Sequence, residues 1–119
     1  FGECFDVILA CGILYHVPDP VRFLSRLRDL VRDDGRVVLD TEVLSSTDDD
    51  RDIARFESRP DNPATRDGYG WIPSRATLAE WVRLAGFRYS VPEQPKGVGY
   101  HEGTRVVWRL ETVYGGSVG

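Results

Sequence analysis

The stretch FDVILACGILYHVPDP, residues 5–20, decides the fold that we expect for this chain. Within it, residues 7–11 form an uninterrupted apolar run that is too short for a helix and rich in branched side chains. Such a run is typical of a strand buried on both faces of a parallel sheet. Gly12 ends the run, and residues 13–18 are expected to form a loop. The sequence therefore predicts a central strand whose carboxyl end carries a turn.

A helix and a second strand are predicted after this turn. Asp19 is expected to cap the helix, and Pro20 suits its first position because no hydrogen-bonding N–H is needed there. Apolar residues recur at helical spacing from Val21 to Val31, and Gly35 is predicted to end the helix. Residues 36–41, RVVLDT, predict the second strand. Strand, helix and strand make a βαβ unit, whose crossover we expect to be right-handed.

The rest of the chain predicts one more helix and two strands after a long loop. Residues 44–70 have no sustained apolar period, which favours a lid, a binding loop or an inserted loop, with a helical turn near residues 53–56. A helix is predicted from Pro73-Ser74 to Gly86, and strands over residues 87–91 and 105–114. The predicted fold class is therefore α/β: a parallel βαβ unit followed by a helix and a terminal antiparallel strand pair.

Composition limits the classes of function. The 119 residues suffice for one small domain or part of a larger one. A net charge of -4 argues against a nucleic-acid grip in this stretch, because phosphate binding needs clustered positive charge. The longest apolar run, residues 7–11, is too short to cross a membrane. Cys4 and Cys11 would lie roughly 23 Å apart along a strand, so we expect free thiols and a cytoplasmic protein.

Candidate functional residues follow the two predicted parallel strands, because ligands of open α/β sheets bind at the carboxyl ends of the strands. These candidates are Cys11, Gly12, Tyr15, His16, Thr41 and Glu42. His16 is either a general base or a partner of the following loop, and Tyr15 either stacks near a ligand or plugs the edge of the sheet. Cys11 either lines the cofactor site, acts as a nucleophile or packs in the hydrophobic core. Neither histidine has a metal-ligating companion at useful spacing, so we predict no metal site.

The same stretch resembles a known superfamily. Residues 5–20 look like the fourth-strand region of class I S-adenosylmethionine-dependent methyltransferases. Residues 34–39, DGRVVL, resemble their fifth strand, and residues 69–87 resemble the late segment of these enzymes that ends in Ala-Gly-Phe. The resemblance covers nearly the whole chain. It implies the C-terminal half of a Rossmann-like methyltransferase sheet that uses S-adenosylmethionine.

Within that superfamily, the nearest pattern is the tRNA wobble-uridine carboxymethyltransferase family, which uses carboxy-S-adenosylmethionine. The matching motifs are GILYH at residues 12–16, LDT at residues 39–41, IPS at residues 72–74, and Gly99-Tyr100 followed by Arg105. One departure is Cys11, where the family usually has methionine. The resemblance implies tRNA modification, with tRNA or a small molecule as the acceptor.

The resemblance also implies roles for individual residues. Cys11, Gly12 and Tyr15 would contact the cofactor, and Arg105 would bind a carboxylate, which a guanidinium can hold through two parallel hydrogen bonds. His16 is the candidate catalytic base toward the substrate. Transfer would be an in-line displacement at the carbon bound to the sulfonium.

The glycine-rich first turn and the ribose-binding acid of these enzymes are not among the residues of this sequence. The chain begins with Phe1, and we expect residues 1–119 to be a partial methyltransferase domain that lacks the N-terminal half and is inactive alone. Its open strand edge along residues 7–11 would be covered by that half, or by a second copy in a homo-oligomer. The alternative is a non-catalytic, methyltransferase-like remnant or accessory subunit that binds a partner.

Overall fold

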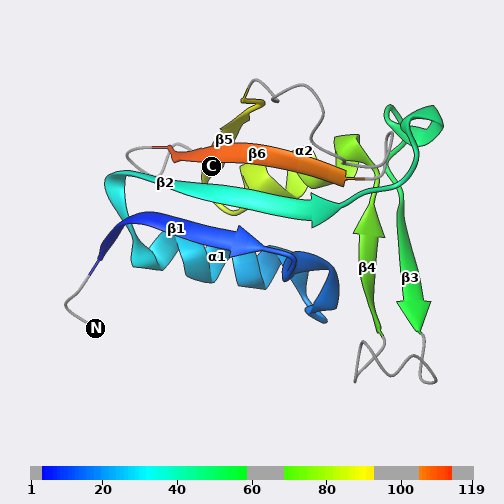
Figure 1. Cartoon of the computed structure of the whole chain (residues 1–119), viewed down its shortest axis with the longest axis horizontal. Coiled ribbons are helices and arrows are strands. Elements are labelled where there is room, and N and C mark those ends of the chain that lie inside the picture. Colours follow the sequence, from blue (N-terminus) through cyan, green and yellow to red (C-terminus); the bar gives the residue numbers. More distant parts are fainter. Residues whose placement is uncertain (1–3, 59–68, 93–104, 114–119) are drawn as a thin grey trace.

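The fold is built on a mixed four-stranded sheet (Figure 1). The computed structural model describes residues 4–58, 69–92 and 105–113. The order of the strands is β1-β2-β6-β5, and their bounds are β1 (Phe5–Cys11), β2 (Val31–Glu42), β6 (Arg105–Thr112) and β5 (Phe87–Ser90). β1 pairs with β2 in parallel, and β6 is antiparallel to both of its neighbours. The predicted α/β class, with a parallel unit and a terminal antiparallel pair, is confirmed.

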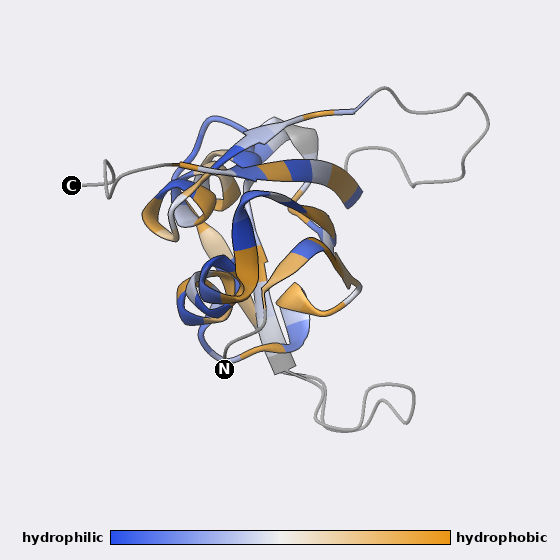
Figure 2. Ribbon diagram, turned by 90° about the vertical axis from the view of Figure 1, so that its left-hand side faces the viewer, coloured by the Kyte–Doolittle hydropathy of each residue, from blue (hydrophilic) through white to orange (hydrophobic). Residues whose placement is uncertain are grey.

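Two helices, α1 (Pro20–Leu30) and α2 (Arg75–Leu84), cover one face of this sheet (Figure 2). Their apolar stripes pack on alternate residues of the strands, because successive side chains of a strand point to opposite faces. The core residues from these elements are Ala10, Leu24, Leu27, Val37, Leu39, Leu78, Val82, Phe87, Trp108 and Leu110. No described helix is long and apolar enough to cross a membrane.

Both helices begin, and α2 ends, as their local sequences predict. The Asp19 carboxylate accepts a hydrogen bond from the backbone N–H of Arg22 (3.1 Å), and the Ser74 hydroxyl accepts one from Thr77 (3.1 Å). Each cap satisfies an N–H that the first helical turn leaves without a partner. Gly86 follows α2 with a φ of 95°, a conformation in which glycine avoids the strain of a side chain.

The end of α1 differs from the prediction. The helix stops at Leu30, and β2 begins at Val31, so Gly35 lies inside the strand and does not end the helix. The pairing of β1 with β2 shifts register at this point. A Cβ on Gly35 would lie 2.7 Å from the carbonyl oxygen of Asp6, so this glycine is needed for close approach of two backbones.

β1 forms an edge of the sheet and is not buried on both faces as predicted, because none of the described elements covers the face away from α1 and α2. Ile8 and Ala10 face the helices, whereas Phe5, Val7 and Leu9 are 51%, 51% and 68% exposed. We call the face of the sheet away from α1 and α2 the open face. It carries these three side chains, together with Val38 and several arginines of the neighbouring strands.

The long loop predicted over residues 44–70 is wrong for the part that the structure describes. β3 (Ala54–Ser58) pairs antiparallel with β4 (Tyr69–Pro73), and a short 3-10 turn, η2 (Ser46–Asp48), precedes them. The helical turn predicted near residues 53–56 is therefore mostly strand. The two strands stand apart from the main sheet, beyond the carboxyl ends of β1 and β2 (Figure 1).

Candidate active site at the carboxyl edge of the sheet

Three elements bring polar groups to one edge of the sheet. β1 and β2 are parallel, so their carboxyl ends lie side by side, with Cys11 in register with Asp40. The backbone N–H of Gly12 donates to the Asp40 carbonyl (2.9 Å). β6 runs the other way, so its first residue, Arg105, arrives at this same edge opposite Glu42.

Arg105, Asp40 and Tyr15 form a cluster there. The Arg105 Nε donates to Asp40 Oδ1 at 2.8 Å. The Arg105 guanidinium carbon lies 5.7 Å from the centre of the Tyr15 ring, within the range of a cation–π contact. The two charged side chains are 29% and 17% exposed, so solvent screens this pair less than a surface pair. Tyr15 comes from η1 (Leu14–His16), the turn that follows β1.

The Arg105 guanidinium remains charged in this cluster. Burial lowers its pKa, but hydrogen bonds with the Tyr15 hydroxyl and the Asp40 carboxylate exceed that effect, so the pKa lies above its ordinary value. An arginine with a raised pKa does not lose its proton in any physiological range. The edge of the sheet therefore holds a permanent positive charge.

Gly12 lies beneath this charge. Its φ is 68°, and a Cβ at this position would lie 3.6 Å from the Tyr15 hydroxyl oxygen and 3.7 Å from Arg105 Nη2. A hydroxyl from η1 and a guanidinium nitrogen from β6 therefore approach the same point above the backbone of Gly12. The structure brings the predicted residue Arg105 to Gly12 and Tyr15, two predicted residues that lie about 90 positions before it in the sequence.

The other predicted residues have different surroundings. His16 is exposed, and its ring centre lies 4.4 Å from that of Tyr15. Cys11 is an exposed free thiol at the end of β1, so plain core packing is wrong for it. Thr41 is fully buried among the core, and its hydroxyl has no hydrogen-bond partner among the described residues. Thr41 therefore does not face a ligand at this edge.

β4 supports the turn that carries Tyr15. A Cβ on Gly70 would overlap the carbonyl oxygen of Tyr15, so the backbone of β4 lies directly against η1. This contact is absent from the sequence-based prediction, which treated residues 44–70 as a loop. The available signal was a glycine flanked by aromatic residues, since glycine inside a strand often marks a close backbone approach.

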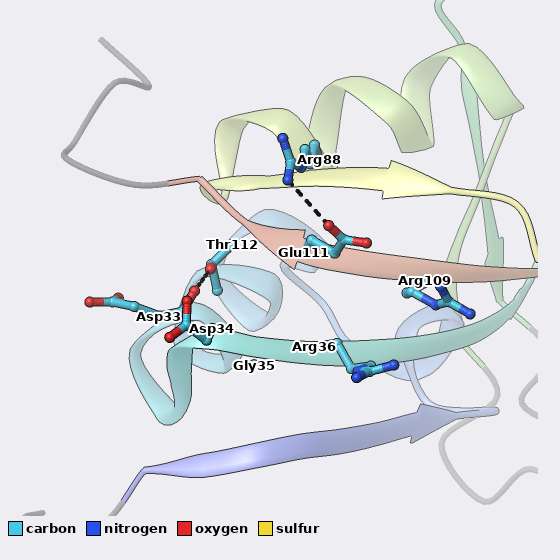
Figure 3. Close-up of a pocket in the computed structure, with 8 residues that line it drawn as sticks. All are labelled: Asp33, Asp34, Gly35, Arg36, Arg88, Arg109, Glu111 and Thr112. Atoms are coloured by element: carbon cyan, nitrogen blue, oxygen red, sulfur yellow. Dashed lines mark hydrogen bonds and ion pairs between the residues drawn. The ribbon is translucent and has the colours of Figure 1, made fainter.

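A cavity lies on the open face near the amino end of β2, away from the Arg105–Asp40–Tyr15 cluster (Figure 3). Its lining is charged: Arg36, Arg88 and Arg109 surround Glu111, and the Arg88 Nη2 lies 3.3 Å from Glu111 Oε2. Arg36 and Arg109 have no ion-pair partner among the described residues. Across the same described ranges, no group of three acidic, histidine or cysteine side chains could hold a metal ion.

The parallel unit, the helices on one face and the polar cluster at the carboxyl ends define a Rossmann-like α/β domain, a class whose ligands bind at this edge of the sheet. Residues 2–90 match the methyltransferase domain family, and the chain belongs to that family. The resemblance inferred from the motifs at residues 5–20 and 34–39 is confirmed at this level.

Curated relatives carry a more specific name. The chain is 32% identical over 119 residues to a tRNA U34 carboxymethyltransferase of Campylobacter hominis, and 33% identical over 85 residues to that of Chromohalobacter salexigens. These matches cover 100% and 71% of the chain, but 39% and 24% of the two relatives. The chain thus spans less than half the length of the curated relatives that it matches.

Solved structures agree on the fold. A 1,6-didemethyltoxoflavin-N1-methyltransferase of Burkholderia thailandensis, bound to 1,6-didemethyltoxoflavin and S-adenosylhomocysteine, superposes with a TM-score of 0.67 at 26% identity. The match covers 95% of this chain and 46% of that one. The N-terminal domain of EvdMO1, solved with SAH bound, gives a TM-score of 0.68 at 22% identity and shares the fold. It covers 92% of this chain and 47% of the other.

Proposed function

We propose that this chain is the C-terminal half of a methyltransferase domain that transfers a carboxymethyl group from carboxy-S-adenosylmethionine to the wobble uridine of a tRNA. One observation carries the proposal: the Tyr15 hydroxyl and Arg105 Nη2 converge above Gly12. Relatives named tRNA U34 carboxymethyltransferase support this assignment of the reaction.

The residues present fit a carboxylate. Arg105 supplies a permanent positive charge and has no acceptor atom, so any bond that it makes to Tyr15 uses the Tyr15 oxygen as the acceptor. The proton of the Tyr15 hydroxyl is then left to donate to a ligand oxygen. Gly12 adds no side chain between the two donors. A carboxylate above Gly12 would thus accept charge-assisted hydrogen bonds from Arg105 and a further bond from Tyr15.

The remaining site residues complete the proposal. The bound cofactor supplies an electrophilic carbon attached to a sulfonium. Cys11 and Gly12 would line the cofactor at the end of β1, and the exposed His16 imidazole would accept the proton that the acceptor loses as its oxygen or nitrogen attacks. Holding cofactor and acceptor in line is the main contribution of the protein to such a displacement.

Binding measurements on the protein extended by its upstream coding sequence test the carboxylate site. Arg105→Ala is expected to lower the affinity for carboxy-S-adenosylmethionine, measured by calorimetry, about 10- to 100-fold, because a hydrogen bond to a charged group contributes roughly 1.5–3 kcal/mol. Tyr15→Phe should weaken it less. Binding of S-adenosylmethionine, which has no such carboxylate, should change less than about twofold with either variant.

Arg109→Ala is the matched control, since Arg109 lies on the same strand but at the charged cavity of the open face. It should leave both affinities unchanged. An equal loss of both ligands in Arg105→Ala would contradict the carboxylate assignment. Absence of binding by the unsubstituted extended protein would favour the alternative of a non-catalytic, partner-binding remnant.

We also propose that the N-terminal half of the domain covers the open face and pairs with β1. Phe5, Val7 and Leu9 form an exposed apolar row on an edge strand, a combination that recruits another strand or chain. Farther across the same face, Arg36 and Arg109 have no acidic partner in the described parts of the chain, so the covering segment should be apolar over β1 and acidic over β2 and β6. Edge-to-edge pairing of two copies is the competing outcome.

A further inference from the structure

We propose that Asp40 is a positioning residue for the carboxylate site: it holds the Arg105 guanidinium through Nε and thereby leaves the Nη1/Nη2 end of the guanidinium for the ligand. The inference rests on the proposed function and extends it to a residue outside the predicted cofactor contacts. Asp40 itself does not touch the ligand in this arrangement. Its effect reaches the ligand through Arg105 and through the backbone of Gly12.

The sheet places Asp40 where it can act on both residues. Asp40 is in register with Val107, so Arg105 is its diagonal neighbour on the same face of adjacent strands. The 2.8 Å bond from Nε fixes the end of the longest and most flexible side chain in the cluster. The carbonyl of Asp40 also accepts the N–H of Gly12 at 2.9 Å. One residue therefore ties together the two sides of the site.

The choice of Nε decides which edge of the guanidinium is left for a ligand. A guanidinium presents its five N–H donors in a planar fork, and a carboxylate binds it either beside Nε or at the end that carries Nη1 and Nη2. Asp40 occupies the Nε side. The end remains, and its Nη2 lies 3.7 Å from the point above Gly12. The ligand carboxylate would therefore dock end-on, at the edge next to the one that Asp40 occupies.

This placement also limits charge repulsion. Two carboxylates on different edges of one guanidinium are each closer to the positive charge than to one another, so both attractions are kept. Removal of the Asp40 charge would release the side chain of Arg105 to other rotamers. The loss of a preorganised donor pair weakens the binding of a ligand that needs both donors and leaves the binding of a ligand without a carboxymethyl group on its sulfur unaffected.

The test compares two ligands on each variant of the extended protein. Asp40→Asn is expected to lower the affinity for carboxy-S-adenosylmethionine about tenfold and the affinity for S-adenosylhomocysteine less than about twofold. Asp40→Glu, which keeps the charge, should recover part of the lost affinity. In an Arg105→Ala background, Asp40→Asn should cause no further loss of carboxy-S-adenosylmethionine, because its effect passes through the arginine.

Glu111→Gln is the matched control: it removes a carboxylate that pairs with an arginine on the same face but far from the site, and it should leave both affinities unchanged. Equal weakening of both ligands by Asp40→Asn would assign it a merely structural role and overturn the inference. Tighter binding of carboxy-S-adenosylmethionine would also overturn it, since Asp40 would then be a competitor for Arg105. Failure of Arg105→Ala to separate the two ligands would reject the carboxylate site itself, which is a different result.

Discussion

Gly70 and Gly12 act at the scale of single residues, and both do so by leaving out a side chain next to Tyr15. Gly70 admits the backbone of β4 against the Tyr15 carbonyl, and Gly12 leaves room beneath the Tyr15 hydroxyl. The position of one aromatic side chain thus depends on two glycines from different parts of the chain. Only Gly12 was singled out from the sequence, because it follows an obvious strand, whereas the aromatic neighbours of Gly70 were a weaker signal.

Gly70→Ala is therefore expected to push β4 away from η1. An added methyl group that overlaps backbone should lower the free energy of unfolding by about 1–3 kcal/mol, measured by urea denaturation. In the extended protein, carboxy-S-adenosylmethionine should bind more weakly as well, since Tyr15 moves with its turn. Ser90→Ala, an exposed change at the end of β5, is the control. A variant as stable as the parent protein would show that the contact between β4 and η1 is not tight.

At the scale of elements, local signals predicted most of the fold. Caps and glycine stops depend on neighbouring residues, so the start of α1 and both ends of α2 follow from the sequence. The pairing of β3 with β4 depends on residues separated by a long connection, and neither strand has a clean alternation of apolar and polar residues. The Arg105–Asp40 pair joins positions 65 residues apart. The family resemblance singled out Arg105 but gave no reason to join it to Asp40.

The two helix-capping side chains, Asp19 and Ser74, differ in the additional hydrogen bonds that they make. The Asp19 side chain makes its cap bond at an exposed helix end, whereas the Ser74 hydroxyl is fully buried and also donates to the carbonyl of Arg51, in the segment before β3. Arg75 adds an ion pair to Asp49 (2.6 Å) in that same segment. The start of α2 therefore anchors the segment that leads into β3.

Ser74→Ala should consequently destabilise the protein more than Asp19→Ala. Loss of a cap alone costs about 1 kcal/mol, and loss of the additional bond from Ser74 to the Arg51 carbonyl, which still accepts the N–H of Ile53, costs roughly 0.5–1.5 kcal/mol more. Urea denaturation of the two variants measures the difference directly. Equal losses in both variants would mean that the bond to Arg51 contributes nothing to stability.

At the scale of the whole molecule, the two faces of the sheet are unequal. α1 and α2 seal one face, while β1 leaves Leu9 68% exposed on the other. A protein rarely leaves a row of large apolar side chains on an edge strand without covering it. The exposed row agrees with the open edge expected from the sequence, although the same residues were predicted to be buried on both faces.

Leu9→Lys tests whether the open face is covered in the extended protein. In the 119-residue chain it should change the free energy of unfolding by less than about 0.5 kcal/mol, because the side chain is mostly in solvent. In the extended protein it should cost about 3 kcal/mol or more, since an unpaired charge would be buried under the covering half. Leu84→Lys, at a 50% exposed position on α2, should be mild in both. A mild effect of Leu9→Lys in both proteins would rule out the covered face.

The donors of the proposed carboxylate site and Asp40, the residue that we propose aligns them, come from strand ends and one turn of this chain. All the residues that determine the preference for a carboxylated cofactor should then be transferable together. A chimera that joins this segment to the N-terminal half of an ordinary methyltransferase should therefore prefer carboxy-S-adenosylmethionine, because the segment brings the contacts between β1, β2 and β6 with it.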